Sequence, residues 1–385
     1  MEKKIILVCG EPSGDLQAGL LVSKLKELDK DIRVFAVGGE NLRQAGAEVF
    51  QDIKGLSVLG LFDVLKKIGV FKQLMNTILD KIGQVKPDAV ILVDFSGFNL
   101  RLAKSLNKRY PVIYYISPQV WASRQGRVET IRKFIDKLIV IFKFERDFYQ
   151  KFGIQAEFVG HPLLDIVKPK TDKKSFCQEF GLQENSPIFA LLPGSRASEV
   201  KRILPVMLES ARIIQEKIPS AQFIISKPSG MDNSIYASSL RGAKRRSNLN
   251  LEVKLIDSRQ YDCLNAADFV LVCSGTATLE TAIMRKPNVI IYKMGLLNYL
   301  LYRPLVKLPF IGMENIVAGK MLAPEFIQFR TRPQLIANKV LEIFNNKKLL
   351  EGLNEDFASL RLKLGAPGAP LRASQSVLAF LNSSS

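Results

Sequence analysis

Short apolar runs alternate with amphipathic segments along the whole chain, and glycine-rich turns separate many of them. Runs rich in Val and Ile are typical of strands that are buried on both faces of a parallel sheet. Because segments of helical period lie between the runs, the pattern predicts βαβ units and an α/β protein. The expected strands are residues 5–8, 33–36, 89–93, 112–115, 137–141, 157–159, 188–192, 222–225, 252–256, 269–272 and 289–292.

The alternation ends near residue 165 and restarts at residue 188, so we predict two doubly wound Rossmann-like domains that face a cleft. The first spans residues 1–165 and the second residues 166–345, and helices in 346–385 are expected to pack back across both. Residues 168–174 are polar and are predicted to form a linker. Within the second domain, Pro205 is expected to restart the helix as its first residue. The basic run 244–246 is expected to lie in a solvated loop.

Residues 268–287 combine a buried strand, a small-residue turn and a helix with a carboxylate near its start. Ser274, Gly275 and Thr276 let the backbone turn tightly, and the free N–H groups of the following helix can hold a diphosphate. Glu280 lies about one turn later, where its carboxylate can accept hydrogen bonds from the two hydroxyls of a ribose. The stretch indicates a nucleotide-sugar site, although an ordinary turn with Ser274 and Thr276 as caps fits it equally well.

A second turn of this kind follows the expected strand 188–192. It contains Ser195 and Arg196 in the segment PGSR. Because a guanidinium can bridge two phosphate oxygens, Arg196 is well placed to bind a diphosphate.

Carboxylates also follow two strands of the first half. Glu11, Ser13 and Asp15 lie in GEPSGD after the first strand, and Asp94 lies in VDFSGFN after strand 89–93. Ligands of open α/β sheets bind at this carboxyl edge. The apolar neighbours of Asp94 are expected to desolvate it partly, which would raise its pKa and make it a better general base. Helix capping by Asp15 and Asp94 is the alternative interpretation.

Three further residues of the first half are candidates for sugar or phosphate contacts. The only tryptophan, Trp121, lies close to Arg124, a combination that suits a sugar or a phosphate and also suits plain packing. The only histidine, His161, stands in VGHP and is expected near the domain junction.

Residues 56–84 have helical period but too many apolar positions for a helix with one buried face. Between residues 54 and 74, Lys54, Lys66, Lys67 and Lys72 stand against a single acid, Asp63. Such a segment fits docking on an anionic membrane or holding acyl chains, and a core helix with a solvated lysine face is the alternative. The residues assigned to membrane or acyl-chain contact are Val58, Leu59, Phe62, Leu65, Val70 and Phe71.

The formal net charge of +18 favours anionic partners, such as a nucleic acid, a phosphorylated substrate or a membrane. The basic residues are not interleaved with stacking aromatics, so nucleic acid is not expected as a partner. No Asp-x-Asp pair lies near the nucleotide motifs, and neither a metal nor another cofactor is expected. The four cysteines have no paired spacing, which suits a reducing cytoplasm. The sequence contains no apolar run of about 18 residues, so a transmembrane helix is not expected.

Eight segments occur in an order and spacing that resemble the lipid-A-disaccharide synthase family: GEPSGD, VDFSGFN, YYISPQVWASRQGR, FVGHPLLD, LLPGSRASEV, SGTATLE, ENIVAG and PEFIQ. The resemblance covers nearly the whole chain. It implies an inverting glycosyltransferase of the GT-B architecture. The implied reaction transfers diacylglucosamine from UDP-2,3-diacylglucosamine to the 6-hydroxyl of 2,3-diacylglucosamine 1-phosphate, giving a β-1,6-linked disaccharide 1-phosphate and UDP.

The resemblance also implies roles for single residues. Glu11 and Asp94 match the essential acids of the acceptor- and lipid-binding N-terminal domain, and Arg196 matches the diphosphate-binding arginine of the UDP-sugar domain. Gly97 stands where some members have a second aspartate, so that later acid cannot be the base here. The uridine-diphosphate region maps to Ser274, Gly275, Thr276 and Glu280, with Asn315 and Gln328 on neighbouring loops.

With acylated substrates implied, membrane docking becomes the favoured interpretation of residues 54–74. The expected location is the cytoplasm, with peripheral attachment to the inner face of the cytoplasmic membrane. The sequence allows a homo-oligomer without requiring one. A UDP-sugar 2-epimerase on the same scaffold is the alternative enzyme, but it needs several acids and bases around the sugar ring and explains less.

Overall fold

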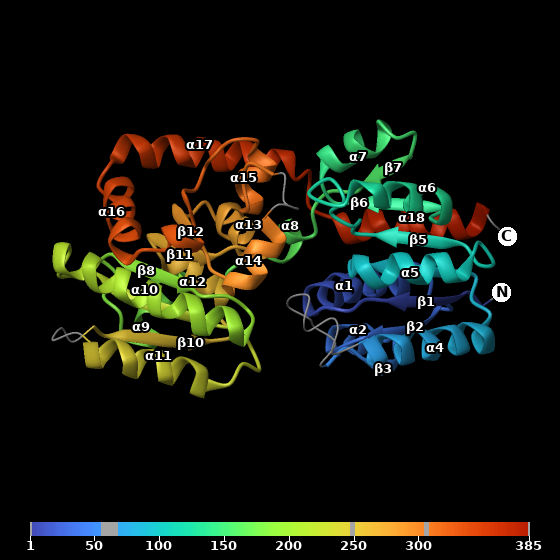
Figure 1. Ribbon diagram of the computed structural model, residues 1–385, viewed down its shortest axis with the longest axis horizontal. Helices are drawn as coiled ribbons and strands as arrows, with labels where there is room; N and C mark the ends of the chain where they lie inside the picture. The colour runs from blue at the N-terminus through green and yellow to red at the C-terminus, as the bar shows by residue number, and fades with distance from the viewer. Residues whose placement is uncertain (1, 55–67, 247–250, 304–307, 384–385) are drawn as a thin grey trace. The chain divides into compact units, whose positions relative to one another are not determined.

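The computed structural model describes residues 2–54, 68–246, 251–303 and 308–383. These residues form two compact α/β units (Figure 1). Unit 1 contains Met1–Asp165 and Leu364–Ser385, and unit 2 contains Ile166–Arg303 and Leu308–Lys363. The C-terminal region expected to pack across both domains is therefore divided, because its first helix continues unit 2 and its last helix belongs to unit 1.

Unit 1 is built on a seven-stranded parallel sheet with the order β3-β2-β1-β4-β5-β6-β7. The order reverses between β1 and β4, which are paired neighbours. The central strands are buried along their whole length, as their continuous apolar runs require. The strands are β1 (Lys4–Val8), β2 (Arg33–Gly38), β3 (Glu48–Asp52), β4 (Ala89–Val93), β5 (Val112–Tyr115), β6 (Lys137–Val140) and β7 (Ala156–Phe158).

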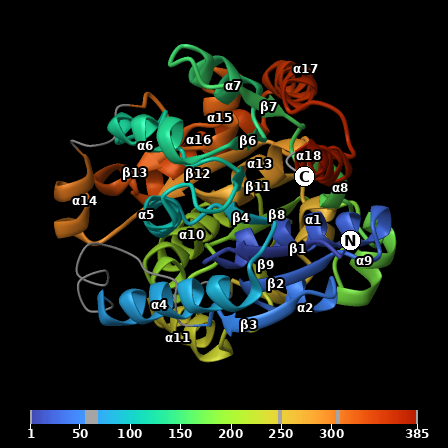
Figure 2. The ribbon, with the colours of Figure 1, turned by 90° about the vertical axis from the view of Figure 1, so that its right-hand side faces the viewer.

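The last helix of the chain, α18, completes unit 1 by packing beside α1 (Figure 2). The Ser374 hydroxyl donates a 3.0 Å hydrogen bond to the Leu21 carbonyl oxygen, and Arg372 Nε donates one of 2.8 Å to the Val159 carbonyl oxygen. The helices of unit 1 are α1 (Pro12–Leu28), α2 (Glu40–Gln44), α4 (Ile68–Val85), α5 (Ser96–Leu106), η1 (Gln125–Arg127), α6 (Val128–Phe134), α7 (Lys143–Gln150) and α18 (Ala369–Ser383); α8 (Leu163–Ile166) leads into unit 2.

Unit 2 contains a six-stranded parallel sheet with the order β10-β9-β8-β11-β12-β13, which reverses between β8 and β11. Alternate residues of the central strands β8, β9, β11 and β12 enter two apolar clusters, one on each face of the sheet. The strands are β8 (Ile188–Leu192), β9 (Gln222–Lys227), β10 (Val253–Asp257), β11 (Phe269–Cys273), β12 (Asn288–Tyr292) and β13 (Glu325–Ile327). The helices are α9 (Lys173–Phe180), α10 (Ala197–Lys217), α11 (Asn233–Arg246), α12 (Gln260–Ala266), α13 (Thr276–Ile283), α14 (Leu296–Tyr302), α15 (Met313–Ala318), η3 (Gln328–Arg330), α16 (Pro333–Phe344) and α17 (Lys347–Lys363).

Two local expectations were wrong, and a third holds only in part. Pro205 lies inside α10 and does not restart a helix, because buried residues on both sides of it, such as Ile203 and Met207, hold α10 against the sheet. The basic run 244–246 ends α11 and is helical. The expected linker is tied to unit 2, since the amides of Lys170 and Thr171 donate to Asp262 and Asp172 caps α9.

Candidate active site

In unit 1, the loops after β1 and β4 meet where the strand order reverses, which is the usual ligand-binding position of a doubly wound sheet. Glu11 is the N-cap residue of α1 and Asp94 follows β4 directly. The loops touch, because a Cβ at Gly10 would lie 2.3 Å from the Phe95 ring, and one at Gly14 would lie 3.8 Å from the Asp94 Cβ. Glycine at position 10 therefore allows the close approach of the loops that bear the two acids.

The backbone at Asp94 is held in an uncommon conformation. Asp94 and Phe95 both have φ of 48°, in the left-handed region that L-residues seldom adopt. The Asp94 carbonyl oxygen accepts hydrogen bonds from the Tyr114 hydroxyl at 2.6 Å and from Asn99 Nδ2 at 2.9 Å. Two buried donors thus fix the turn that places the half-buried Asp94 side chain at the carboxyl edge of the sheet.

The other candidate acid of this edge, Asp15, has a structural environment. Its carboxylate is buried and accepts from the Gly39 amide at 2.6 Å, the Asn41 amide at 3.0 Å and Asn41 Nδ2 at 2.8 Å. These bonds order the turn between β2 and α2. Ser13 is exposed in the first turn of α1.

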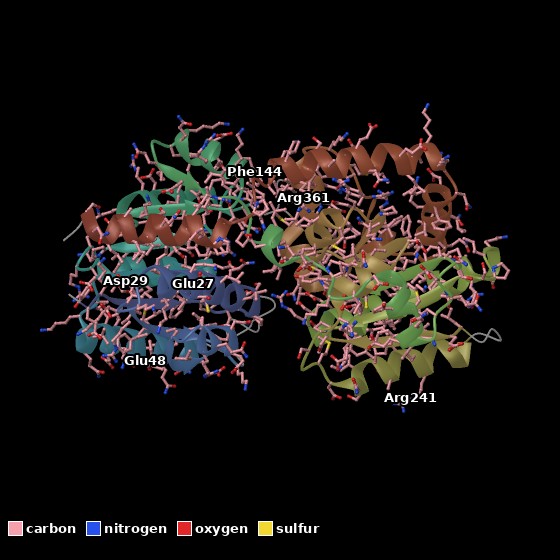
Figure 3. The ribbon with its side chains drawn as sticks, turned by 180° about the vertical axis from the view of Figure 1, so that it is seen from behind. Glu27, Asp29, Glu48, Phe144, Arg241 and Arg361 are labelled. Atoms are coloured by element: carbon pink, nitrogen blue, oxygen red, sulfur yellow. The ribbon has the colours of Figure 1, made fainter. Side chains whose placement is uncertain are left out.

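Trp121 leads to a buried carboxylate that sequence reasoning missed. Glu145 Oε1 accepts from the Trp121 indole Nε1 at 3.1 Å and from the Ser117 hydroxyl at 2.9 Å, and Oε2 accepts from the Phe142 amide at 3.2 Å. Burial raises the pKa of Glu145 to about 7. Phe144, labelled in Figure 3, packs edge to face against Trp121. The only local sequence signal for Glu145 is its position, three residues after the N-cap of a helix that follows a strand.

The segment that carries Trp121 also reaches the Asp94 loop through Arg127, a second arginine near Trp121 in the sequence. Arg127 Nη1 donates to the Ser96 hydroxyl at 3.4 Å. Burial lowers the pKa of Arg127, and the nearby charge of Arg124 lowers it further. Arg124 itself is exposed and has a left-handed φ of 56°.

His161 is buried and neutral. Its Nδ1 accepts a 3.1 Å hydrogen bond from the Leu163 amide, and its ring packs on Phe142 at 4.9 Å between centroids. Burial lowers its pKa to about 3. An uncharged imidazole offers no positive charge to a phosphate, so the structure supports a role in holding this end of unit 1.

In unit 2, the turns after β8 and β11 lie side by side at the point where the strand order reverses. Glu199 accepts from the amides of Ser195 at 3.1 Å and Arg196 at 3.3 Å, and it pairs with the Arg196 guanidinium at 3.2 Å. Gly194 has φ of 119°, and a Cβ there would lie 2.5 Å from a Glu199 oxygen. Burial raises the pKa of Cys273 at the end of β11, the charge of Glu199 raises it further, and the charge of Arg196 lowers it. Arg196 therefore lies close to the end of β11.

The second turn joins β11 to α13. Gly275 has φ of 153°, and Thr276 is exposed at the first position of the helix. The Ser274 hydroxyl donates to the Ile311 carbonyl oxygen at 3.0 Å, and Thr278 Oγ1 accepts from the Met313 amide at 3.1 Å. The turn is therefore tied to the loop before α15.

Asn315 and Gln328 hold loops beside this turn. Asn315 is fully buried and bonds the Ala323 backbone, and its Nδ2 also donates to Glu325 at 2.9 Å. Gln328 bonds both backbone groups of Met294, at 3.2 Å and 3.1 Å. The side-chain amides of Asn315 and Gln328 are thus hydrogen-bonded within the protein, which supports a role for both residues in positioning these loops.

Glu280 is nearly buried, and its two oxygens have partners. They accept from Tyr261 OH at 2.9 Å and Gln260 Nε2 at 2.5 Å, and burial raises the pKa of Glu280. Each carboxylate oxygen can accept one more hydrogen bond, so a ribose contact is compatible with this network.

Of the residues assigned to membrane contact, Val58, Leu59, Phe62 and Leu65 lie outside the described residues. Val70 is 47% exposed on α4, whereas the Phe71 ring packs at 6.0 Å from Phe95. Leu74, Ile78 and Ile82 of the same helix are buried in the core of unit 1. Within the described parts of the chain, no helix is both long and apolar enough to cross a bilayer.

Comparisons with known proteins agree with this architecture. A family model described as lipid-A-disaccharide synthetase matches residues 5–373. The lipid-A-disaccharide synthase of Syntrophus aciditrophicus (strain SB) is 41% identical over 383 residues, 99% of each chain. That of Coxiella burnetii (strain Dugway 5J108-111) is 37% identical over 363 residues, 94% of each chain.

Solved structures with the same fold include a sugar-nucleotide epimerase and a glycosyltransferase. The UDP-GlcNAc 2-epimerase from Neisseria meningitidis bound to UDP-GlcNAc aligns with a TM-score of 0.63 at 14% identity, over 99% of this chain and all of its own. A glycosyltransferase from Rickettsia africae ESF-5 aligns with a TM-score of 0.58 at 13% identity, over the whole of both chains.

The two parallel-sheet α/β units have the fold of the GT-B glycosyltransferases and related epimerases, which confirms the predicted fold class. Within that class, the chain belongs to the lipid-A-disaccharide synthase family.

Proposed function

We propose that this chain transfers 2,3-diacylglucosamine from UDP-2,3-diacylglucosamine to the 6-hydroxyl of 2,3-diacylglucosamine 1-phosphate. The products are the β-1,6-linked disaccharide 1-phosphate and UDP. Family membership supports the reaction. The structural observation that carries it is the division of chemistry between two sheets. Carboxylates stand at the switch point of unit 1, and an arginine with a small-residue turn stands at that of unit 2.

In the reaction, the acceptor 6-oxygen attacks the anomeric carbon while the bond from that carbon to the diphosphate oxygen breaks, so the configuration inverts. We assign Asp94 as the base that takes the hydroxyl proton, with Glu11 as the second carboxylate of the same edge. UDP leaves with the bonding electron pair. Arg196 and the free N–H groups at the start of α13 stabilise its charge.

We also infer that the protein binds peripherally to the inner face of the cytoplasmic membrane. Acylated substrates belong to the bilayer, and the net charge of +18 favours an anionic surface. The exposed Val70 on α4, at the end of the lysine-rich segment, is compatible with this location.

Omission of single substrates tests the proposed reaction. UDP should be released when the purified protein receives both acylated glucosamines, and release should stop when either is left out. UDP release from the nucleotide sugar alone would indicate a hydrolase. Conversion of the donor to its 2-epimer without release would indicate an epimerase.

A further inference from the structure

Unit 2 carries an apolar surface that the proposed reaction does not use. Leu296, Leu297, Leu300 and Leu301 of α14 are 53%, 56%, 59% and 44% exposed. Positions i, i+1, i+4 and i+5 share one side of a helix. Phe329, 66% exposed, extends this side, and its ring meets Tyr299 edge to face at 6.0 Å. We call the four leucines and Phe329 the α14 face. Among the described residues, no other helix exposes four large apolar side chains.

Positive charge surrounds the α14 face. Lys293 precedes the helix, Arg303 is its C-cap residue and Arg330 follows Phe329. Arg202 Nη2 lies 3.8 Å from the place that a Cβ on Gly295 would take. The sequence from residue 293 to residue 303 contains no acidic residue. The acids that flank α14 along the chain, Glu280 and Glu314, are buried. Glu325, four residues before Phe329, accepts hydrogen bonds from Asn315 Nδ2 and the Gly312 amide.

The α14 face lies at the carboxyl edge of the unit 2 sheet. The chain leaves β12 at Tyr292, and Gln328 fixes the next loop through its two hydrogen bonds to Met294. α14 begins two residues later (Figure 1). Arg196 and Ser274 follow neighbouring strands at this same edge.

We propose that the α14 face docks unit 2 on an anionic lipid bilayer. Its leucines and Phe329 would enter the boundary of the acyl chains, and the basic residues around them would meet the headgroups. Charge argues for lipid over a second copy of this chain. A two-fold contact would bring Lys293, Arg303 and Arg330 toward their own counterparts. The inference deepens the proposed function and rests on it only in one respect, that the substrate to be reached is acylated.

Vesicle binding tests the surface without any turnover. We would compare the unaltered protein with the double variant Leu297→Ser, Leu300→Ser by flotation with phosphatidylethanolamine–phosphatidylglycerol vesicles. Leu362→Ser is the matched control, because Leu362 is 81% exposed on α17 of the same unit. We expect the double variant to lose at least about tenfold in partitioning and the control to change little. Lys293→Gln with Arg330→Gln should weaken binding to these vesicles and abolish their advantage over phosphatidylcholine vesicles.

A second readout reports insertion directly. Phe329→Trp should be quenched by brominated lipids beyond the quenching of Trp121 in the unaltered protein, and Leu362→Trp should not. Unchanged flotation of the double variant, or equal quenching at positions 329 and 362, would overturn the proposal. Loss of the cooperative melt in the double variant would also overturn the proposal. The same holds if the unaltered protein is a dimer and the double variant is a monomer with unchanged flotation. Neither assay measures glycosyl transfer, so failure of the docking proposal can be distinguished from failure of the proposed reaction.

Discussion

The indole Nε1 of Trp121 donates a 3.1 Å hydrogen bond to Oε1 of Glu145, a carboxylate buried in unit 1. The bond joins the segment after β5 to the start of α7. Since Arg127 links that segment to the loop of Asp94, the buried acid supports one side of the candidate catalytic edge.

Glu145 should make stability fall as pH rises. Burial raises its pKa from 4.5 to about 7. The folded state therefore keeps a proton that the unfolded state has lost between these values, and the free energy of unfolding should decrease across this window by roughly 3 kcal/mol. Glu145→Gln keeps an oxygen for Trp121 and Ser117 but cannot titrate. Urea unfolding at several pH values should show a smaller decrease in the variant, and identical slopes would contradict the assignment.

His161 should act in the opposite direction. Its pKa falls from 6.5 to about 3, so the unfolded state takes up a proton that the folded state refuses as the solution is acidified. Stability should be complete above pH 6.5 and decrease by a few kcal/mol toward pH 3. His161→Asn retains an acceptor for the Leu163 amide and removes the titration. Acid denaturation should begin at lower pH in this variant, and an unchanged midpoint would show that His161 is not buried neutral.

Several element boundaries follow directly from local sequence. Residues 260–266 and 333–344 read as helices in the sequence and form α12 and α16, and Pro333 stands at the first position of the latter. The edge strand β3 was missed because EVFQD has only two apolar residues, shows neither an apolar run nor an alternation, and is only partly buried. The predicted helix start at Pro205 was wrong because the tertiary packing of α10 outweighs the loss of one backbone hydrogen bond within the helix.

The candidate site divides in the same way. Residues that lie within four positions of a strand's carboxyl end, such as Glu11, Asp94 and Arg196, can be located from the strand pattern alone. Glu145 could not, because its partners Ser117 and Trp121 are 28 and 24 residues away in sequence. The contacts of Asn315 and Gln328 likewise depend on loops that only the folded chain brings together.

Replacing the proposed base should affect turnover more than nucleotide binding. Asp94→Asn retains the shape of the side chain but cannot take the hydroxyl proton, so turnover should fall by about 10²- to 10⁴-fold. UDP binding, measured by calorimetry, should stay close to normal. Asp88→Asn is a useful control because Asp88 lies at the opposite end of the same strand. Normal turnover in Asp94→Asn would reject the assignment, and Glu11→Gln would then be tested.

Chelation should leave the reaction intact. We assign neutralisation of the leaving diphosphate to Arg196 and the start of α13, so no divalent ion is required. Activity should survive EDTA, while Arg196→Gln should raise the Kd for UDP. Loss of activity in EDTA with recovery on adding Mg²⁺ or Mn²⁺ would refute this account.

The most direct test of the central claim is to quantify both products of one reaction. Purified protein is incubated with UDP-2,3-diacylglucosamine and 2,3-diacylglucosamine 1-phosphate, and UDP and the lipid product are measured together by mass spectrometry, with the anomeric configuration read by NMR. We predict one disaccharide 1-phosphate of β configuration for each UDP released. UDP without disaccharide, an α-linked product, or a 2-epimer of the donor would contradict the account.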